Sequence, residues 1–301
     1  MKIFVTGGAG FIGKYLVKSL IHNQHKVTIF DNFSNSLEET VSDFVKKGVK
    51  IIKGDIRNID EISSAIKNHE IVIHLAAKIS VEESIKNPRE TFDVNIQGTK
   101  NVLTACLNNK INKIIISSSA AVYGESEPKK LNENSIKKPI SPYGESKMKM
   151  EEEITKFCSI HKINFIILRF FNIFGVGQSD EYAGVITKFR NRILQNNSLE
   201  IFGDGNQTRD FVAIEDVVSS INQAVKKISK QGIYNIASGN AISIKYLAEL
   251  MISKSGKKLK INFLQPKKGD IKHSQADITL AKKNIGYNPR FSIDEKIKEM
   301  L

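Results

Sequence analysis

The sequence of 301 residues has few cysteines and no long apolar run, and these shortages exclude several classes of protein. Its two cysteines, Cys106 and Cys158, fall in helix-like patterns without metal-type partners, so we expect buried, reduced thiols rather than a disulfide scaffold. The six histidines are scattered, and no metal site is predicted. No window offers about 18 uncharged apolar residues, and the first residues lack a leader-peptide pattern. We therefore expect a cytoplasmic protein with no membrane partner.

The formal net charge of +13 raises the question of a nucleic-acid partner. The lysines, however, are spread along the whole chain, and no basic tract is interleaved with aromatic residues. We therefore predict a solvated lysine surface that helps to attract an anionic substrate, and no nucleic-acid partner.

The first thirteen residues run from an apolar strand directly into glycines at Gly7, Gly10 and Gly13. The first glycine permits a tight reversal, the second leaves room for a pyrophosphate, and the third lets the next helix pack close to the sheet. A helix N-terminus at this place favours negative charge. The pattern predicts a dinucleotide site.

Asp31 ends the next strand-like run, about 20 residues after the glycine turn, where a carboxylate accepts the ribose hydroxyls of a dinucleotide. Residues 32–36 contain no Arg or Lys to receive a 2′-phosphate. These features favour NAD over NADP. The alternative is an aspartate that merely caps a turn.

Strand-like runs alternate with helix-period segments at 11–23, 58–68, 89–108 and 145–160. The strand-like runs are Lys2–Thr6, Lys26–Asp31, Val49–Lys53, Ile71–Leu75, Lys113–Ser119 and Asn164–Phe170. Their Val/Ile stretches are continuous, which predicts strands covered on both faces, hence an α/β fold with a doubly wound parallel sheet of the Rossmann type. We expect an NAD-binding domain over residues 1–170 and a smaller substrate-binding α/β domain over 171–301. Phe211–Ile236 resembles a helix-strand unit, so the chain is expected to return to the large sheet near 211–236.

Tyr143 and Lys147 stand four residues apart near the start of a predicted helix, so both side chains share one face. A tyrosine base at neutral pH needs its pKa lowered by roughly 3 units, and a nearby ammonium and the positive nicotinamide of NAD favour that change. Ser119 ends a neighbouring strand and could bind the same substrate oxygen. We predict that these three residues are catalytic, although such a pair is also common on exposed helices.

The chain resembles the extended short-chain dehydrogenases/reductases over nearly its whole length. The resemblance rests on the glycine turn, Asp31, His74-Leu-Ala-Ala, Asn95 with Gly98-Thr, Ser117-Ser-Ser-Ala-Ala-Val-Tyr-Gly, Pro142-Tyr-Gly-Glu-Ser-Lys and Arg169-Phe-Phe-Asn-Ile-Phe-Gly. Downstream, the segments starting at Tyr182, Ile201 and Lys268 look like those of UDP-hexose 4-epimerases. The resemblance implies a UDP-sugar substrate, a transient 4-keto sugar and bound NAD, and it implies a homodimer formed through the helices near 89–108 and 145–160.

The resemblance also assigns roles residue by residue. It places Asp55 against adenine and Phe170 against the nicotinamide. The cofactor residues would be Gly7, Gly10, Phe11, Ile12, Gly13, Asp31, Asn32, Ser34, Asn35, Ser36, Asp55, Ile56, Leu75, Ala76, Ala77, Asn95, Ser117, Tyr143, Lys147 and Phe170. The substrate residues would be Ser80, Ser119, Tyr143, Asn172, Val185, Phe202, Arg209, Lys267, Asp270 and Ser274. The small Ser274 would leave space for an N-acetyl group at C2, unless neighbouring side chains refill it.

Two departures from the family pattern affect these expectations. Lys267 stands where arginine is usual, so a bidentate phosphate contact becomes a point charge. Ala121 replaces a hydroxyl residue found in some 4-epimerases, which leaves Ser119 as the main hydrogen-bond partner. Ala120 and Ala121 also stand where dehydratases carry Asp-Glu, and Ala121 stands where a decarboxylase uses a glutamate, so both rival activities are disfavoured. A non-catalytic Rossmann module that senses NAD or holds a partner such as RNA is the remaining alternative, and it is disfavoured because Ser119, Tyr143 and Lys147 are all present.

Overall fold

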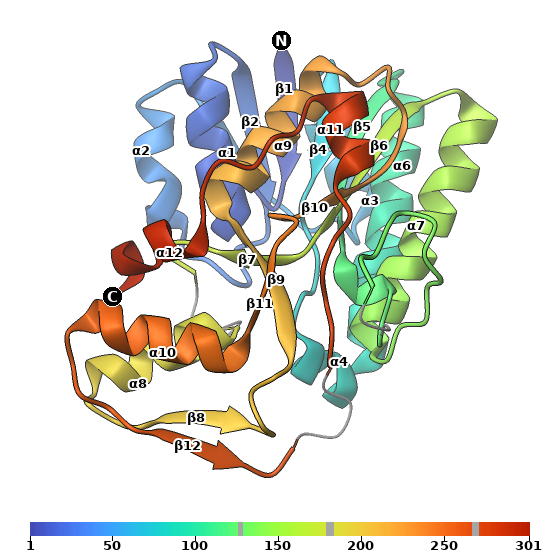
Figure 1. Cartoon of the computed structure of the whole chain (residues 1–301). Coiled ribbons are helices and arrows are strands. Elements are labelled where there is room, and N and C mark those ends of the chain that lie inside the picture. The colour runs from blue at the N-terminus through green and yellow to red at the C-terminus, as the bar shows by residue number, and fades with distance from the viewer. Residues whose placement is uncertain (126–128, 179–183, 267–270) are drawn as a thin grey trace.

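A computed structural model of the chain describes residues 1–125, 129–178, 184–266 and 271–301. Its largest element is a seven-stranded sheet in the order β10-β6-β5-β4-β1-β2-β3, in which every pair of neighbours is parallel (Figure 1). The strands are β1 (Lys2–Thr6), β2 (Lys26–Asp31), β3 (Lys50–Lys53), β4 (Ile71–His74), β5 (Lys113–Ser119), β6 (Asn164–Phe170) and β10 (Gly232–Ile236). The predicted α/β fold with a parallel sheet is confirmed.

Helices cover both faces of this sheet. Alternate strand residues point to opposite faces and contribute to two separate apolar cores. Ile3 and Val5 of β1 belong to the core beneath α1 (Phe11–His22), α9 (Ile214–Lys226) and α11 (Thr279–Ile285). Phe4 belongs to the core beneath α3 (Ile59–Ala65), α6 (Thr99–Asn108) and α7 (Pro142–His161). The two cores make the large sheet the middle of three layers.

Some boundaries differ from the sequence-based prediction. The segment expected as one helix over 89–108 forms α5 (Pro88–Phe92), a π-helix η2 (Asp93–Gly98) and α6. Helix α7 begins at Pro142, earlier than expected, because the Ser141 hydroxyl accepts a hydrogen bond from the Gly144 N–H at 3.1 Å and proline suits the first turn. The helix ends at His161, so both of its ends lie beyond the predicted 145–160.

A smaller part of the molecule stands over the carboxyl ends of the large sheet's strands (Figure 1). It holds a three-stranded sheet of β7 (Asn172–Phe174), β9 (Thr208–Ala213) and β11 (Ala241–Ser243), and a two-stranded sheet of β8 (Leu199–Phe202) and β12 (Ile261–Leu264). Helices α8 (Val185–Leu194) and α10 (Ile244–Ser255) pack around a third apolar core. The chain reaches this part after β6, returns to the large sheet with α9 and β10, and then leaves it again.

Short elements complete the described chain. They are η1 (Glu38–Val41), α2 (Ser42–Val45), α4 (Val81–Lys86), the 3₁₀ turn η3 (Ala120–Val122), α12 (Ile293–Lys296) and η4 (Ile297–Met300). Of these, α4 and η3 matter for the site, because they follow β4 and β5 at the carboxyl edge of the sheet.

Candidate active site

Two adjoining cavities lie at the carboxyl edge of the large sheet. The first has a volume of about 330 Å³ and the second of about 650 Å³. Both are lined by Ile12, Leu75, Ile79, Ile173 and Gln178, so they form one continuous cleft. Most residues predicted to bind the cofactor line the first cavity: Gly7, Gly10, Phe11, Ile12, Gly13, Asp31, Asn32, Ser34, Asn35, Ser36, Asp55, Ile56, Leu75, Ala76 and Ala77.

The three predicted glycines occupy sterically different places. Gly7 has a φ of +69°, and a Cβ there would lie 2.6 Å from the Ala76 nitrogen, so only glycine fits. A Cβ on Gly13 would overlap the Gly7 carbonyl oxygen. Gly10 is different, since its nearest neighbour would be that same oxygen at 3.3 Å, which leaves the cavity side open. Because α1 has no side-chain cap and no acidic residue in its first turn, its N-terminus can accept a phosphate.

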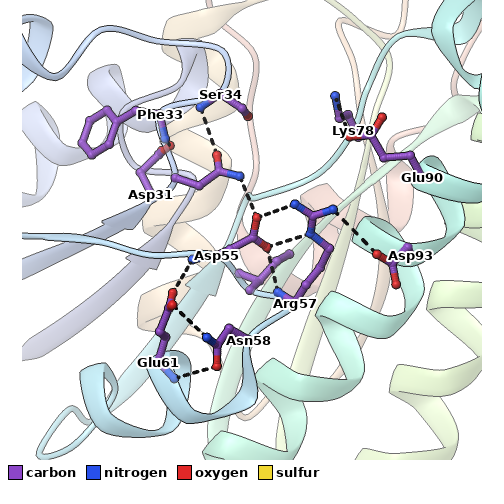
Figure 2. Close-up of polar contacts among 12 residues, drawn as sticks. Asp31, Phe33, Ser34, Asp55, Arg57, Asn58, Glu61, Lys78, Glu90 and Asp93 are labelled. Carbon is purple, nitrogen blue, oxygen red and sulfur yellow. Dashed lines mark hydrogen bonds and ion pairs between the residues drawn. The ribbon is translucent and has the colours of Figure 1, made fainter.

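Asp31 lies at the end of β2 with its carboxylate oriented by two backbone N–H groups. Oδ2 accepts from Ala9 N and Oδ1 from Phe33 N, each at 2.9 Å. Figure 2 shows Asp31 beside Phe33 at this turn. Burial raises the pKa of Asp31, and the two donors oppose that rise. Each oxygen retains a lone pair for another donor, so the carboxylate can receive two ribose hydroxyls. The glycine turn and this aspartate together fit a dinucleotide.

Asp55 and Arg57 form a rigid pair at the far end of the first cavity (Figure 2). Arg57 donates from Nε to Oδ1 at 3.0 Å and from Nη2 to Oδ2 at 2.7 Å, and Asn32 Nδ2 donates to Oδ2 at 3.0 Å. These contacts, led by Arg57, lower the pKa of Asp55 to about 2. Arg57 lines the cavity but had not been predicted, because it belongs to no motif that points to a cofactor.

Asn95 acts from behind the cavity wall rather than within it. The π-helix η2 carries it, and its side chain is 1% exposed. Its Oδ1 accepts from Lys78 N at 2.8 Å, while Nδ2 donates to Lys78 O and to Ser146 Oγ, both at 2.9 Å. Asn95 therefore ties the loop after β4 to α7. Lys78 lines the cavity and pairs with Glu90 at 3.3 Å, and sequence reasoning had missed it.

Ser119, Tyr143 and Lys147 meet in the second cavity, together with Ser117 and Phe170. Ser119 ends β5, while Tyr143 and Lys147 lie one turn apart on α7. A hydrogen bond joins the side chains of Ser119 and Tyr143, and Lys147 Nζ donates to the Ser117 carbonyl at 3.1 Å. The structure thus brings the three predicted catalytic residues to one place.

Burial shifts both ionisable groups toward their neutral forms. It raises the pKa of Tyr143, and the hydrogen bond from Ser119 opposes this. It lowers the pKa of Lys147 to about 8, and the negative charge of Glu151 opposes this. The protein alone therefore keeps the phenol protonated at neutral pH, and a nearby positive charge is needed before Tyr143 can act as a base.

The predicted substrate residues divide into two groups. Asn172, Val185, Phe202 and Arg209 line the second cavity. Arg209 Nη1 donates to the Thr208 carbonyl at 2.9 Å and the Ile271 carbonyl at 2.6 Å, which orients the guanidinium.

The other predicted substrate residues do not line the cavity or fall outside the described chain. Ser80 caps α4 by accepting from Glu83 N at 3.1 Å. Ser274 is buried, with 7% exposure, and is not among the described lining residues. Lys267 and Asp270 lie outside the described residues. Apolar and charged side chains that had not been predicted complete the lining: Ile79, Val81, Ile186, Lys188, Phe189 and Glu200.

Other expectations about special sites can be checked in the described residues. Cys106 and Cys158 are buried, unpaired thiols, as expected. Within the described ranges no three His, Cys, Asp or Glu side chains gather as a metal site would require. No helix in the same ranges combines the length and the apolar character needed to cross a membrane.

Comparison with known proteins identifies the relatives of the chain. Residues 3–237 match the NAD dependent epimerase/dehydratase family. A UDP-N-acetylglucosamine 4-epimerase from Methanobrevibacter ruminantium, solved with UDP-N-acetylmuramic acid, is 35% identical with a TM-score of 0.94, covering 99% of this chain and 96% of its own. A UDP-glucose 4-epimerase from Thermotoga maritima, solved with UDP-glucose, is 32% identical with a TM-score of 0.92 and the same coverage.

Relatives at similar identity are described with other activities. A UDP-glucuronic acid 4-epimerase from Bacillus cereus, solved with UDP-glucuronic acid and NAD, is 31% identical with a TM-score of 0.91, covering 99% of this chain and 97% of its own. A UDP-N-acetyl-alpha-D-glucosaminuronate decarboxylase from Bacillus cytotoxicus is 30% identical over 100% of this chain and 96% of its own length. Overall identity therefore does not select one sugar or one reaction.

Proposed function

Because the chain belongs to the NAD dependent epimerase/dehydratase family, we propose that it is a 4-epimerase of UDP-hexoses. The observation that carries this proposal is the meeting of Ser119, Tyr143 and Lys147 in a cavity that continues into the dinucleotide cleft. A base, its electrostatic support and a hydroxyl then stand beside the place where a nicotinamide would lie.

The proposed reaction begins with Tyr143 as a phenolate that takes the proton of the sugar C4 hydroxyl. The C4 hydrogen leaves with its bonding electrons, and the C4–O single bond becomes the carbonyl of a 4-keto sugar. Ser119 holds the same oxygen and the Tyr143 hydroxyl. NAD held by the residues of the first cavity would supply the hydride acceptor and donor for C4, and its positive nicotinamide would favour the phenolate. Tyr143 gives the proton back as the C4 hydroxyl forms again, so atoms and electrons balance.

Lys147 contributes charge and position rather than a proton. Its ammonium is buried, and its hydrogen bond to the Ser117 carbonyl fixes it at the cavity that Tyr143 also lines. A positive charge at this place favours ionisation of a phenol that burial otherwise keeps neutral. Phe170, at the end of β6, covers one side of the reacting region.

Elimination of water needs an additional acid and base, and loss of carbon dioxide needs a group that protonates the carbon left behind. The residues that follow Ser119 are Ala120 and Ala121 on the 3₁₀ turn η3, and the Ala121 N–H donates to the Ser119 hydroxyl at 3.1 Å. Methyl groups at these two places cannot move protons, which supports epimerisation over dehydration or decarboxylation. A non-catalytic NAD-binding scaffold is a weaker second proposal.

For the sugar, we propose UDP-glucose and UDP-galactose together with their N-acetyl forms. The support is the small Ser274, which the family resemblance places beside the C2 substituent. The UDP would lie against Asn172, Val185, Phe202 and Arg209. We also propose a homodimer through the surfaces of α5, α6 and α7, which light scattering in solution tests.

The test uses UDP-sugars that carry deuterium at C4. Purified protein should form the C4 epimer with the deuterium still at C4, because the hydride leaves and returns within one closed site. A product that has lost water, or carbon dioxide from a uronate, would overturn the assignment in favour of a dehydratase or a decarboxylase. If none of the UDP-sugars tested is converted, the non-catalytic NAD-binding scaffold is favoured.

A further inference from the structure

A buried ion pair lies directly behind the proposed catalytic residues. Glu151 stands on α7, one turn after Lys147 and two turns after Tyr143, so all three share one side of the helix. Arg169 of β6 donates to it from Nε to Oε1 at 2.8 Å and from Nη2 to Oε2 at 2.7 Å. Both side chains are 1% exposed. The geometry is a bidentate fork, which fixes orientation as well as distance.

Ser118 joins the same carboxylate from a third element. Its hydroxyl donates to Glu151 Oε1 at 2.6 Å. In the sheet, Ser118 of β5 stands opposite Arg169 of β6, and the next pair in register is Ser119 opposite Phe170. Each partner in the network is therefore the direct chain neighbour of a residue that lines the second cavity.

The far side of Arg169 is anchored as well. Nη1 donates to the Tyr123 hydroxyl at 2.8 Å and to the Glu133 carbonyl at 2.9 Å, and Tyr123 in turn donates to Asn235 Oδ1 at 2.7 Å. These contacts face away from α7 and offer a way to disturb Arg169 without touching Glu151.

Stability alone is a poor reason for such a pair. Removing two charges from water costs several kcal/mol for each ion, and well-packed apolar residues of similar volume often serve the fold as well or better. A fork that joins a helix to two strands instead restricts how these elements can slide, and the distances between Tyr143, Ser119 and Phe170 depend on that alignment.

We propose that Glu151, Arg169 and Ser118 form a positioning cluster that sets α7 against β5 and β6, so that Tyr143 and Lys147 are held in register with Ser119 and Phe170. The assignment rests on the proposed function in one respect, namely that Tyr143 and Lys147 perform the chemistry. Glu151 and Arg169 do not line the second cavity, whereas Ser118 does line it but donates its hydroxyl to Glu151. The three residues therefore act through their neighbours.

The cluster also brings a negative charge close to Lys147. Glu151 is the carboxylate on the same helix that raises the pKa of Lys147 against the effect of burial. From β4, His74 faces Lys147, and its own pKa is lowered to about 3 by burial and by the lysine charge, so it is neutral at pH 7. The charged groups that face Glu151 itself are Arg169 and Lys137, whose Nζ lies 3.8 Å from Oε2. The carboxylate is therefore the group in this set that favours the charged lysine.

The first experiment compares turnover of UDP-sugars by three variants. Ser118→Ala removes one donor, and Arg169→Lys keeps the charge but cannot form the fork. For both we expect kcat to fall about tenfold or more, with the KM for UDP-sugar and the Kd for NAD within about twofold of wild type, because alignment and not binding is lost. Tyr123→Phe is the matched control, since it weakens the far side of Arg169; we expect a lower Tm and kcat within about twofold.

The second experiment needs no substrate. In protein labelled with ¹³C-lysine, the Lys147 signal, assigned by its loss in Lys147→Met, is titrated by NMR in wild type, Glu151→Gln and Glu153→Gln. We expect the pKa of Lys147 to fall by about one pH unit in Glu151→Gln. Glu153 lies on the same helix, pairs with Lys100 at its surface and serves as the control, for which no change is expected.

The outcomes distinguish a failure of the proposed function from a failure of the positioning cluster. If wild type epimerises no UDP-sugar, the proposed function fails, and the lysine titration alone decides whether Glu151 sets the state of Lys147. If kcat falls in Tyr123→Phe as far as in Ser118→Ala and Arg169→Lys, or falls in none of them, the positioning cluster is overturned. If the pKa of Lys147 is unchanged in Glu151→Gln, the electrostatic role of Glu151 in the positioning cluster is overturned. This result holds even where a turnover variant folds poorly.

Discussion

The two cavities of the cleft are built in different ways. The first owes its shape to backbone: Gly7 fits only without a Cβ, Asp31 is oriented by two N–H groups, and Asn95 clamps the Lys78 backbone. The second owes its shape to side chains from α4, α8, β8 and β9, with Arg209 of β9 among them. Side chains can be exchanged without rebuilding the fold, whereas a backbone cradle cannot. The first cavity therefore suits a cofactor that stays the same among relatives, and the second suits a sugar that differs among them. Relatives described with different UDP-sugars share this fold.

The largest expected effect falls where the two cavities join. Tyr143→Phe should lower turnover by about 10³- to 10⁴-fold, because no group then takes the C4 proton. NAD content should stay as in wild type, since the first cavity is untouched. Turnover by chromatography and NAD released on denaturation give the two measurements, and near-normal activity would remove Tyr143 from the mechanism.

The first cavity also depends on a buried neutral histidine. His74 lies between the hydroxyls of Thr6 and Thr99, at 2.7 and 2.9 Å, and its pKa is lowered to about 3, below its ordinary value of 6.5. Between these values the unfolded chain binds a proton that the folded chain refuses, so stability is present above about pH 6.5 and is lost as the pH falls toward 3. The loss amounts to roughly 5 kcal/mol.

Urea unfolding of His74→Gln at several pH values measures this contribution. The variant should lack most of the acid-dependent loss in the free energy of unfolding. His22→Gln, on the exposed end of α1, should behave as wild type. Equal acid sensitivity in wild type and His74→Gln would show that other groups cause it.

A pair of glycine variants separates folding from binding in the backbone-built cavity. Gly7→Ala should destabilise the fold by about 3 kcal/mol, because its positive φ and its close approach to Ala76 both exclude a side chain. Gly10→Ala should fold with little loss but bind NAD at least about tenfold more weakly, since its methyl group enters the pyrophosphate space. Thermal unfolding and calorimetric titration report the two effects, and equal stability of the two variants would contradict the distinction.

The family resemblance, which places Ser274 beside the C2 substituent, predicts a selective effect on the sugar. Ser274→Tyr should lower the interconversion of UDP-N-acetylglucosamine and UDP-N-acetylgalactosamine by about 100-fold, because the ring would overlap the acetamide. Interconversion of UDP-glucose and UDP-galactose should stay within about threefold. A wild-type protein that converts the hexoses and ignores both N-acetyl sugars would show that neighbouring side chains close the space.

The smallest expected effect concerns the choice of dinucleotide. Asp31→Asn should reduce the preference for NAD over NADP by about 1 to 3 kcal/mol, because the carboxylate repels a 2′-phosphate and binds both ribose hydroxyls. Asp43→Asn, at an exposed site on α2, is the control. Equal affinity of the wild-type protein for both dinucleotides would contradict the role of Asp31.

The sequence predicted the backbone-built cavity better than the side-chain-built one. Gly7 and Asp31 of the first cavity stand at strand ends that apolar runs identify, and parallel strands bring such ends together. Arg57 and Lys78 line the same cavity but were missed, because they lie in loops without periodicity or motif. Their places depend on tertiary contacts with Asp55 and Glu90.

Two side chains with binding roles implied by the family resemblance have hydrogen-bond partners in the structure that the sequence did not predict. The π-helix turns the Asn95 amide toward the backbone of Lys78 and toward Ser146. The Ser80 hydroxyl caps α4. A π-helix leaves no signature in helical periodicity, and the sequence does not distinguish a serine that caps a helix from one that binds a ligand.

The return of the chain to the large sheet has a consequence for synthesis. Strand β6 is buried on both faces, but its outer edge is covered by β10, which lies about sixty residues later in the chain. A chain released at residue 170 would expose that edge together with its apolar side chains, which is a template for pairing with other molecules. During translation the same edge stays open until Gly232–Ile236 has emerged, so the nascent chain should depend on chaperones through this interval.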